Sequence, residues 1–208
     1  MAGKFITLEG GEGVGKSTQA RALAAALRGR GIDLIETREP GGSPGAEAIR
    51  ALLLEGEGDR WSSRAEALLF AAARADHVEK TILPAIHVGK WVICDRFLDS
   101  SLAYQGGADG LGADAIRTLH QIGSKDLLPD RTLLLDMPVY DAGYRQAVAG
   151  IGLSDRFEKR DGGFHDRVAA SFRQFAQAEP KRIRLVSAEG TPEEVTTRLL
   201  DALSDLLP

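Results

Sequence analysis

The chain has 208 residues, of which 43% are hydrophobic and 27% are charged, a composition typical of globular proteins with a buried core. Its formal net charge of -4 argues against the basic surface that general nucleic-acid binding or attachment to anionic membranes requires. No apolar run is long enough to span a bilayer and no signal peptide is recognisable, so we expect a cytoplasmic protein with one domain, residues 1–208. Cys94 is the single cysteine, which excludes an intrachain disulfide.

Five short apolar runs predict buried strands, and longer segments with helical spacing separate them. In chain order, the predicted strands are 4–9, 33–37, 91–95, 131–136 and 182–187. The predicted helices are 16–30, 44–54, 63–88, 113–124, 138–149, 164–179 and 192–206. This alternation predicts an α/β fold of three layers, in which helices flank both faces of a parallel sheet. Glycine-rich stretches at 105–112 and 150–163 fall between the predicted elements and are expected to be functional loops.

A phosphate-binding pattern lies between the first predicted strand and the first predicted helix. The stretch GGEGVGKS fits G-x-x-x-x-G-K-[ST], in the strand-then-helix context that this pattern requires. Glycines let backbone N–H groups approach phosphate oxygens, the lysine neutralises charge, and the hydroxyl can bind Mg²⁺. The alternative is a flexible turn, and the pattern by itself predicts only a nucleoside triphosphate. The predicted ATP-binding residues are Gly10, Gly11, Glu12, Gly13, Val14, Gly15, Lys16, Ser17 and Thr18.

An acidic residue ends the third predicted strand. Asp95 would lie near the phosphate loop, where it could hold Mg²⁺ directly or through water together with Ser17. The alternative is an aspartate that only caps the following turn. The phosphate loop favours the metal interpretation, and we predict Ser17 and Asp95 as the metal site.

Several further motifs resemble those of one family. TREPGG (37–42), LLFAAARADH (68–77), DRFLDSSLAYQGG (95–107) and DRFE (155–158), together with the phosphate loop, resemble bacterial thymidylate kinase in the right order over nearly the whole chain. The resemblance implies a P-loop nucleoside monophosphate kinase fold with a five-stranded parallel sheet. It also implies Mg²⁺-dependent transfer of the γ-phosphate of ATP to dTMP, giving dTDP for dTTP synthesis, by a homodimer.

The resemblance gives chemical roles to residues of a predicted acceptor site. Phe70 and Arg74 are four residues apart and share a helix face, so Phe70 can stack on a pyrimidine while Arg74 donates to thymine O4 and rejects cytosine. Tyr104 could fill the space of a ribose 2′-OH. Without the resemblance, Phe70 would be interpreted as a core residue and AYQGG as a polar turn. The predicted dTMP-binding residues are Arg38, Glu39, Pro40, Phe70, Arg74, Arg96, Ser100, Ser101, Tyr104 and Gln105.

The predicted catalytic groups are mainly cations. Both substrates are anions and the attacking phosphate oxygen is already ionised, so catalysis needs positioning and charge neutralisation rather than a general base. Lys16 serves the ATP phosphates, and Arg96 is the first choice to clamp the acceptor phosphate, with Arg38 second. The resemblance implies that Glu12 faces the acceptor's 3′-OH and the water shell of Mg²⁺.

The sequence departs from the family pattern in its predicted lid, about 144–163. Gly13 after Glu12 matches the class of thymidylate kinases that place catalytic arginines in the lid, yet this lid contains few arginines. Arg156 is the best candidate because it matches the Asp-Arg-x-Glu segment, and Arg145 is next. The alternative for each is a solvated surface arginine.

Three other functions compete with a dTMP kinase. One is a kinase for another nucleotide or a deoxynucleoside. A second is a GTPase switch, which would need an Asn-Lys-x-Asp motif, whereas this chain contains no asparagine. The third is a non-catalytic nucleotide-binding regulator, against which the intact Lys16, Ser17, Asp95 and Arg96 argue.

Overall fold

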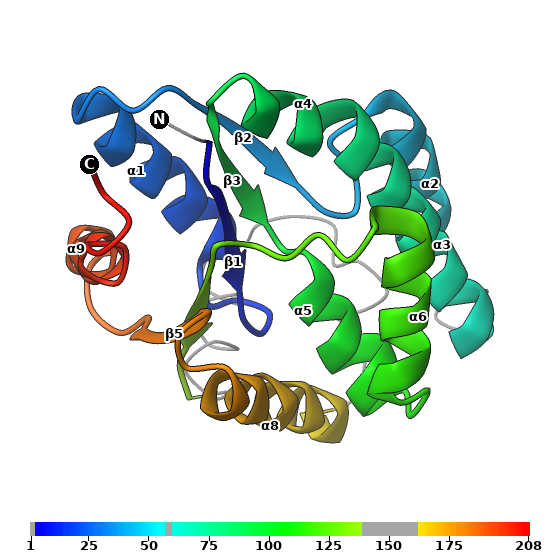
Figure 1. Cartoon of the computed structure of the whole chain (residues 1–208). Helices are drawn as coiled ribbons and strands as arrows, with labels where there is room; N and C mark the ends of the chain where they lie inside the picture. The colour runs from blue at the N-terminus through cyan, green and yellow to red at the C-terminus, as the bar shows by residue number, and fades with distance from the viewer. Residues whose placement is uncertain (1–2, 57–59, 139–161) are drawn as a thin grey trace.

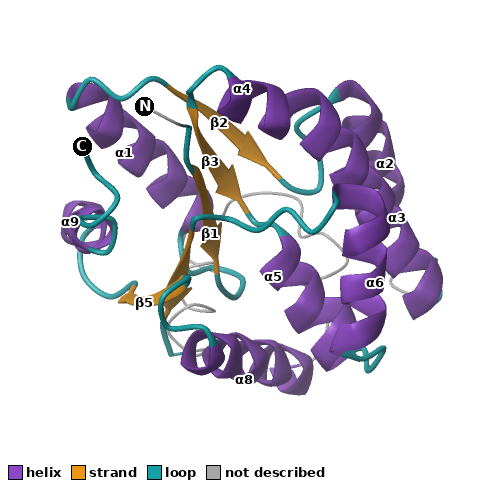
Figure 2. Cartoon of the chain, in the orientation of Figure 1, coloured by secondary structure: helices purple, strands orange, loops and turns teal. Residues whose placement is uncertain are grey.

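A five-stranded parallel sheet forms the centre of the described molecule. The computed structural model describes residues 3–56, 60–138 and 162–208. The strands are β1 (Phe5–Glu9), β2 (Leu34–Arg38), β3 (Trp91–Asp95), β4 (Arg131–Asp136) and β5 (Ile183–Ser187), in the spatial order β2-β3-β1-β4-β5 (Figure 2). All pairs in the sheet are parallel. The predicted parallel sheet is confirmed, and each strand boundary lies within one residue of its prediction.

Helices cover both faces of this sheet (Figure 1). On one face lie α1 and α9, and the remaining described helices pack on or beyond the other face. The three-layer α/β prediction is therefore confirmed. The helical segments are α1 (Lys16–Gly29), α2 (Pro44–Leu54), α3 (Ser63–His77), η1 (Val78–Ile82), α4 (Leu83–His87), α5 (Leu98–Ser101), η2 (Leu102–Ala108), α6 (Ala113–Ser124), α8 (Gly162–Ala178) and α9 (Pro192–Asp201).

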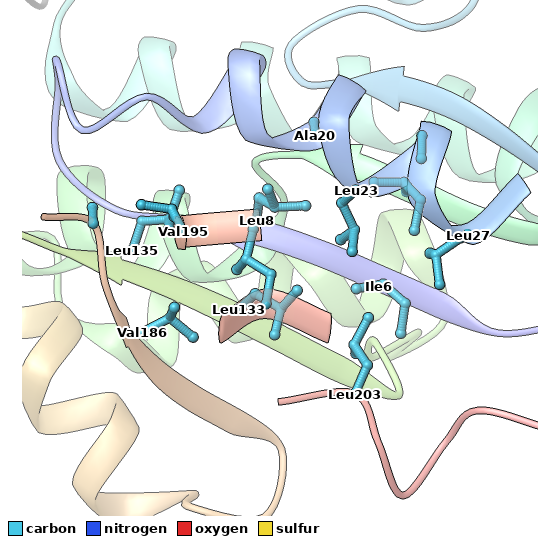
Figure 3. Packing of buried hydrophobic residues seen from close by; sticks show 14 of the residues in the cluster. Ile6, Leu8, Ala20, Leu23, Leu27, Leu133, Leu135, Val186, Val195 and Leu203 are labelled. Atoms are coloured by element: carbon cyan, nitrogen blue, oxygen red, sulfur yellow. The ribbon is translucent and has the colours of Figure 1, made fainter. Parts of the chain in front are cut away.

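Alternation along the strands divides the core into two sides. On β1, Ile6 and Leu8 point toward α1, where Leu23 and Leu27 meet them (Figure 3). Phe5 on the same strand joins the opposite cluster. Burial of these aliphatic side chains contributes about 1.5–3 kcal/mol for each fully buried residue and holds the strand ends in place.

Local signals set several helix starts. Ser43 caps α2 and Pro44 follows it at the first helical position. Thr191 and Glu194 form a reciprocal capping box at the start of α9.

Three helix predictions and one loop prediction need correction or remain open. The predicted helix 63–88 contains the π-helical segment η1, and the predicted helix 192–206 ends as a helix at Asp201. The predicted loop 105–112 is helical up to Ala108, as part of η2. The predicted helix 138–149 lies almost wholly outside the described residues.

Gly107 explains why the glycine-rich stretch was misread. A Cβ atom at Gly107 would lie 2.5 Å from Ser171 Oγ on α8. The glycine therefore allows close packing of η2 on α8, rather than breaking the helix.

Among the described residues, no helix is long and apolar enough to cross a membrane.

Candidate active site

The candidate site lies where the chain changes direction across the sheet. β1 is the central strand and pairs with β3 on one side and β4 on the other. In open α/β sheets, ligands bind beyond the carboxyl ends of strands at such a switch point. The phosphate loop follows β1 at this edge, and beside it Asp95 ends β3 and Arg96 follows that strand.

The phosphate loop has the backbone of an anion cradle. Gly10 and Gly15 have φ values of 141° and 94°, and a Cβ atom at Gly10 would lie 2.5 Å from Leu135 O. These positions therefore require glycine. The N-terminus of α1 has no side-chain cap, so its N–H groups remain for a ligand. Lys16 is buried at this helix start and its Nζ donates to Gly11 O at 2.5 Å.

Ser17 and Asp95 have the chemistry of a Mg²⁺ site. Ser17 Oγ lies 2.5 Å from Asp95 Oδ2, while Asp95 Oδ1 is buried and has no hydrogen-bond partner in the described part of the chain. An acceptor oxygen in that state suits a hard cation. The described residues contain no group of three or more metal-binding side chains. The pair thus fits an ion that takes most ligands from phosphates and water.

A pocket adjoins the phosphate loop. It brings together predicted residues from four separate segments of the chain. It is lined by Glu12, Glu39, Pro40, Phe70, Arg74, Arg96, Ser100, Ser101, Tyr104 and Gln105, and also by Arg50, Leu54 and Phe97.

Glu12 links the phosphate loop to this pocket. Its Oε1 accepts from Arg96 Nη2 at 2.6 Å and from the Tyr104 hydroxyl at 2.8 Å. Burial alone would raise the pKa of Glu12, but the charges of Arg96 and Lys16 lower it to about 2. Glu12 is therefore ionised at neutral pH. The Arg96 guanidinium also lies over the Tyr104 ring, 5.2 Å from its centroid.

Arg96 is held in an uncommon backbone conformation. Its φ is 69°, in the left-handed region that non-glycine residues rarely adopt. Nη1 donates to Ser100 Oγ at 3.1 Å and to Gly10 O at 3.3 Å. The guanidinium is thus positioned at the mouth of the phosphate loop by contacts on several sides.

Behind Ser100 lies a buried glutamate at the end of β1. Glu9 Oε1 accepts from Phe97 N at 2.7 Å and Ser100 N at 3.2 Å, and Ser100 Oγ lies 2.6 Å from Oε2. Burial, with the nearby charge of Asp99, raises the pKa of Glu9 to about 8. Glu9 thereby anchors the turn that carries Arg96.

Arg74 is buried at the other side of the pocket. Its Nε donates to Glu39 Oε2 at 2.8 Å, and its Nη2 donates to Ser101 Oγ at 2.8 Å and Phe97 O at 3.1 Å. Nη1 makes no hydrogen bond to any described residue. The guanidinium is fixed by its neighbours and retains donor capacity at the pocket.

Two further predicted residues are held by their neighbours, one by packing and one by a hydrogen bond. Phe70 packs against the cluster that contains Tyr104, Phe164 and Phe172, and it lines the pocket. Gln105 Nε2 donates to the buried Glu66 at 2.8 Å. The amide of Gln105 is therefore held in one orientation.

Comparison with known proteins agrees with this geometry. The thymidylate kinase family model matches residues 8–199. A thymidylate kinase from Rhizorhabdus wittichii is 76% identical over 208 residues, covering all of both chains. One from Gluconobacter oxydans is 51% identical over 211 residues, covering 100% of this chain and 98% of the relative. This chain belongs to the thymidylate kinase family.

A solved structure supports the same assignment. The crystal structure of thymidylate kinase from Ehrlichia chaffeensis superposes with a TM-score of 0.80 at 31% identity, covering 98% of this chain and 100% of that one. The chain is therefore a kinase with the P-loop nucleoside monophosphate kinase fold, as the sequence predicted.

The remaining predicted site residues of this thymidylate kinase family member lie away from the pocket or outside the described residues. Arg38 is mostly exposed and its Nη2 donates to Glu47 Oε1 at 3.0 Å, so it is paired on the surface. Arg145 and Arg156 lie outside the described residues. Thr18 is exposed in the first turn of α1, next to Ser17.

Four residues at this thymidylate kinase site were missed from the sequence. Arg50 and Leu54 come from α2, and no local motif signals that this helix reaches the pocket. Phe97 follows Arg96 directly within the DRF motif, which could have indicated it. Glu9 ends an apolar strand, and an acid at that position was a signal for a buried polar role.

Proposed function

We propose that the protein transfers the γ-phosphate of ATP to dTMP, giving dTDP and ADP. The observation that carries this proposal is the pocket that joins Phe70, Arg74 and Tyr104 to the phosphate loop through Glu12 and Arg96. The family relationship supports the same reaction.

The acceptor pocket suits a thymine nucleotide. Phe70 offers a ring for base stacking, and Arg74 offers a donor for a base carbonyl such as thymine O4. Cytosine presents an amino group at that position, which leaves a buried donor unpaired at a cost of about 1–3 kcal/mol. Tyr104, whose hydroxyl is bound to Glu12, would stand beside the sugar and disfavour a 2′-hydroxyl.

Positive charge at the phosphate loop drives the transfer. Lys16 neutralises the ATP phosphates, and Arg96 clamps the acceptor phosphate from the opposite side. Arg96 is paired with Glu12 at 2.6 Å, so it engages the acceptor by sharing or exchanging that contact. No general base is needed, because the attacking phosphate oxygen is already ionised.

Ser17 and Asp95 would hold Mg²⁺. When bound, the ion neutralises the β- and γ-phosphate oxygens of ATP. The Ser17 hydroxyl and the unpaired Oδ1 of Asp95 supply oxygen ligands of the type that Mg²⁺ prefers.

The remaining parts of the proposal concern the lid, the assembly and the location. Arg156, then Arg145, would supply the lid cation within a single domain of residues 1–208. We also propose a homodimer that uses Leu68 on α3 and Ile122 on α6, which are 57% and 77% exposed. A cytoplasmic location stays a prediction.

The direct test is product analysis with ATP, dTMP and Mg²⁺. We expect dTDP and ADP in equal amounts, loss of both when EDTA removes the metal, and loss of both in Lys16→Ala. Hydrolysis of ATP without dTDP would contradict the proposal, as would transfer that is unaffected by EDTA.

A further inference from the structure

A buried histidine lies directly behind the base-reading arginine. His77 is the last residue of α3, three residues after Arg74, and its side chain is fully buried. Its Nδ1 lies 3.0 Å from Glu39 Oε1 and its Nε2 lies 2.6 Å from Thr37 Oγ1. Both ring nitrogens therefore have partners. An apolar side chain could fill this core position without needing hydrogen-bond partners. The buried imidazole therefore suggests a function beyond packing.

The partners of His77 define how its protons are arranged. Burial alone would raise the pKa of Glu39, but Arg74 and the hydrogen bond from His77 lower it, so Glu39 is a carboxylate that only accepts. Nδ1 must then carry the proton shared with Glu39. In a neutral ring, Nε2 accepts from the Thr37 hydroxyl, which makes no other hydrogen bond in the described part of the chain. The Glu39 carboxylate thus selects the tautomer, and Thr37 holds the other ring nitrogen.

The backbone also confines the ring. Gly42 has a φ of 85°, and a Cβ atom there would overlap both His77 Nε2 and Thr37 Oγ1. Thr81 Oγ1 donates to Gly42 O at 2.7 Å and holds this turn in place. The imidazole therefore has little freedom to turn away from Glu39.

Glu39 transmits this orientation to the pocket. One oxygen accepts from His77 and the other accepts from Arg74 Nε at 2.8 Å. A carboxylate held only by Arg74 could rotate about its terminal torsion, which is broad and roughly two-fold. The donor on its far oxygen fixes the carboxylate plane, and hence the direction in which the guanidinium points.

His77 does not itself line the pocket, whereas Glu39 and Arg74 do. We propose that His77 is a positioning residue for acceptor recognition: held by Thr37, it orients the Glu39 carboxylate, which fixes the Arg74 guanidinium at the acceptor base. This inference deepens the proposed function and rests on it. A small displacement of such a recognition group weakens binding of the substrate strongly.

Two substitutions separate the contacts of His77. In His77→Asn the amide nitrogen can replace Nδ1 and keep the bond to Glu39. In His77→Gln the longer side chain reaches toward Thr37 and loses the bond to Glu39. His87→Gln is the matched control, because His87 is exposed on the neighbouring α4. For each protein, KM and kcat with dTMP, KM for ATP, relative use of dCMP and the thermal midpoint are measured.

We expect His77→Gln to raise KM for dTMP by about tenfold or more and to increase the relative use of dCMP. His77→Asn should stay within about threefold of the wild type, and kcat at saturating dTMP and KM for ATP should change little in either variant. An unchanged KM for dTMP in His77→Gln would overturn the inference. So would a rise in KM for dTMP that is equal in the two variants and matches an equal fall in their thermal midpoints.

Thr37→Val provides a milder variant in case the ring substitutions prevent folding. It removes only the hydroxyl that holds Nε2 of the His77 ring, so it should raise KM for dTMP while leaving KM for ATP unchanged. An unchanged KM for dTMP in Thr37→Val would count against the relay. A wild type that prefers another nucleotide would refute the proposed function, and the same variants measured with that nucleotide would still test His77.

Discussion

At the residue scale, the site depends on buried charges that hold one another. Arg74 and Glu39 are both buried and ion-paired, and each also hydrogen-bonds a second side chain, Ser101 for Arg74 and His77 for Glu39. A buried ion destabilises the fold unless it has such partners. The Arg74–Glu39 pair therefore affects both the stability of the fold and the recognition of the acceptor base. A substitution at either residue will therefore change both properties unless a second change separates them.

We predict that Arg74→Ala lowers kcat/KM for dTMP by about 10- to 100-fold, because a hydrogen bond to a charged group contributes about 1.5–3 kcal/mol. The same substitution should destabilise the fold by about 3–5 kcal/mol, since the buried Glu39 carboxylate loses its arginine partner and keeps only the contact with His77. Adding Glu39→Gln should restore much of the stability but not the use of dTMP. Steady-state kinetics and urea unfolding measure the two effects. Recovery of dTMP use in the double variant would contradict the role of Arg74.

At the element scale, the end of β1 and the start of α5 are joined by Glu9. Burial raises the pKa of Glu9 in the native protein to about 8, whereas the ordinary pKa of an unperturbed glutamate is 4.5. Between these pH values, unfolding releases a proton, so the contribution of Glu9 to stability falls as pH rises. This pH dependence reports on the contact between β1 and α5, because the backbone N–H groups of Phe97 and Ser100 donate to the Glu9 carboxyl group.

We predict that Glu9→Gln flattens this part of the pH dependence. The amide is neutral at every pH and still accepts from the two backbone N–H groups. The free energy of unfolding should fall between about pH 4.5 and pH 8 in the wild type and less steeply in the variant. Urea unfolding across this range measures it, with the exposed Glu79→Gln as control. Equal slopes for Glu9→Gln and wild type would show that Glu9 is not protonated in the native protein.

The sequence predicted strands better than helix interruptions, for physical reasons. Buried strands in a parallel sheet are continuous apolar runs that begin and end clearly, as 91–95 does. The π-helical segment η1 has no such local signature, since its neighbours on both sides are also helical. Gly106 and Gly107 resembled a loop because glycine is a poor helix former, and only packing against Ile116 of α6 and Ser171 of α8, respectively, explains them.

The site residues that lie in short motifs were predictable from the sequence. Those that reach the site only through packing of distant segments were less predictable. The phosphate loop and the segment after β3 have fixed local patterns. Arg50, by contrast, reaches the pocket only because α2 packs beside it, and the exposed position of Arg38 depends on its pairing with Glu47. The role we infer for His77 also needs the segment 37–42 to contact α3, so sequence spacing alone gave it no function.

At the scale of the whole molecule, α3 and α6 form one outer surface. A Cβ atom at Gly123 on α6 would lie 3.3 Å from Ala75 Cβ and 3.4 Å from Ala71 O on α3, so the two helices pack closely. Leu68 lies one turn before Ala71, and Ile122 adjoins Gly123. Two large exposed apolar side chains on one surface suit burial against a second copy.

We predict that the protein is a dimer and that Leu68→Glu combined with Ile122→Glu shifts it to monomer. Charge placed in an apolar interface is unpaired and costly to bury. Light scattering after size exclusion measures the mass. Leu185→Glu is the control, because Leu185 is 54% exposed on β5 and should leave the mass unchanged. A wild-type monomer, or a dimer that survives both substitutions, would contradict the proposed surface.

The measurement that tests the central claim most directly is ADP release with ATP and Mg²⁺ across dTMP, dUMP, dCMP, dGMP, UMP and thymidine. Phe70, Arg74 and Tyr104 predict strong turnover with dTMP, weaker turnover with dUMP, and little with the others. Strong turnover with dCMP, or none with dTMP despite ATP binding, would contradict the account of the acceptor pocket.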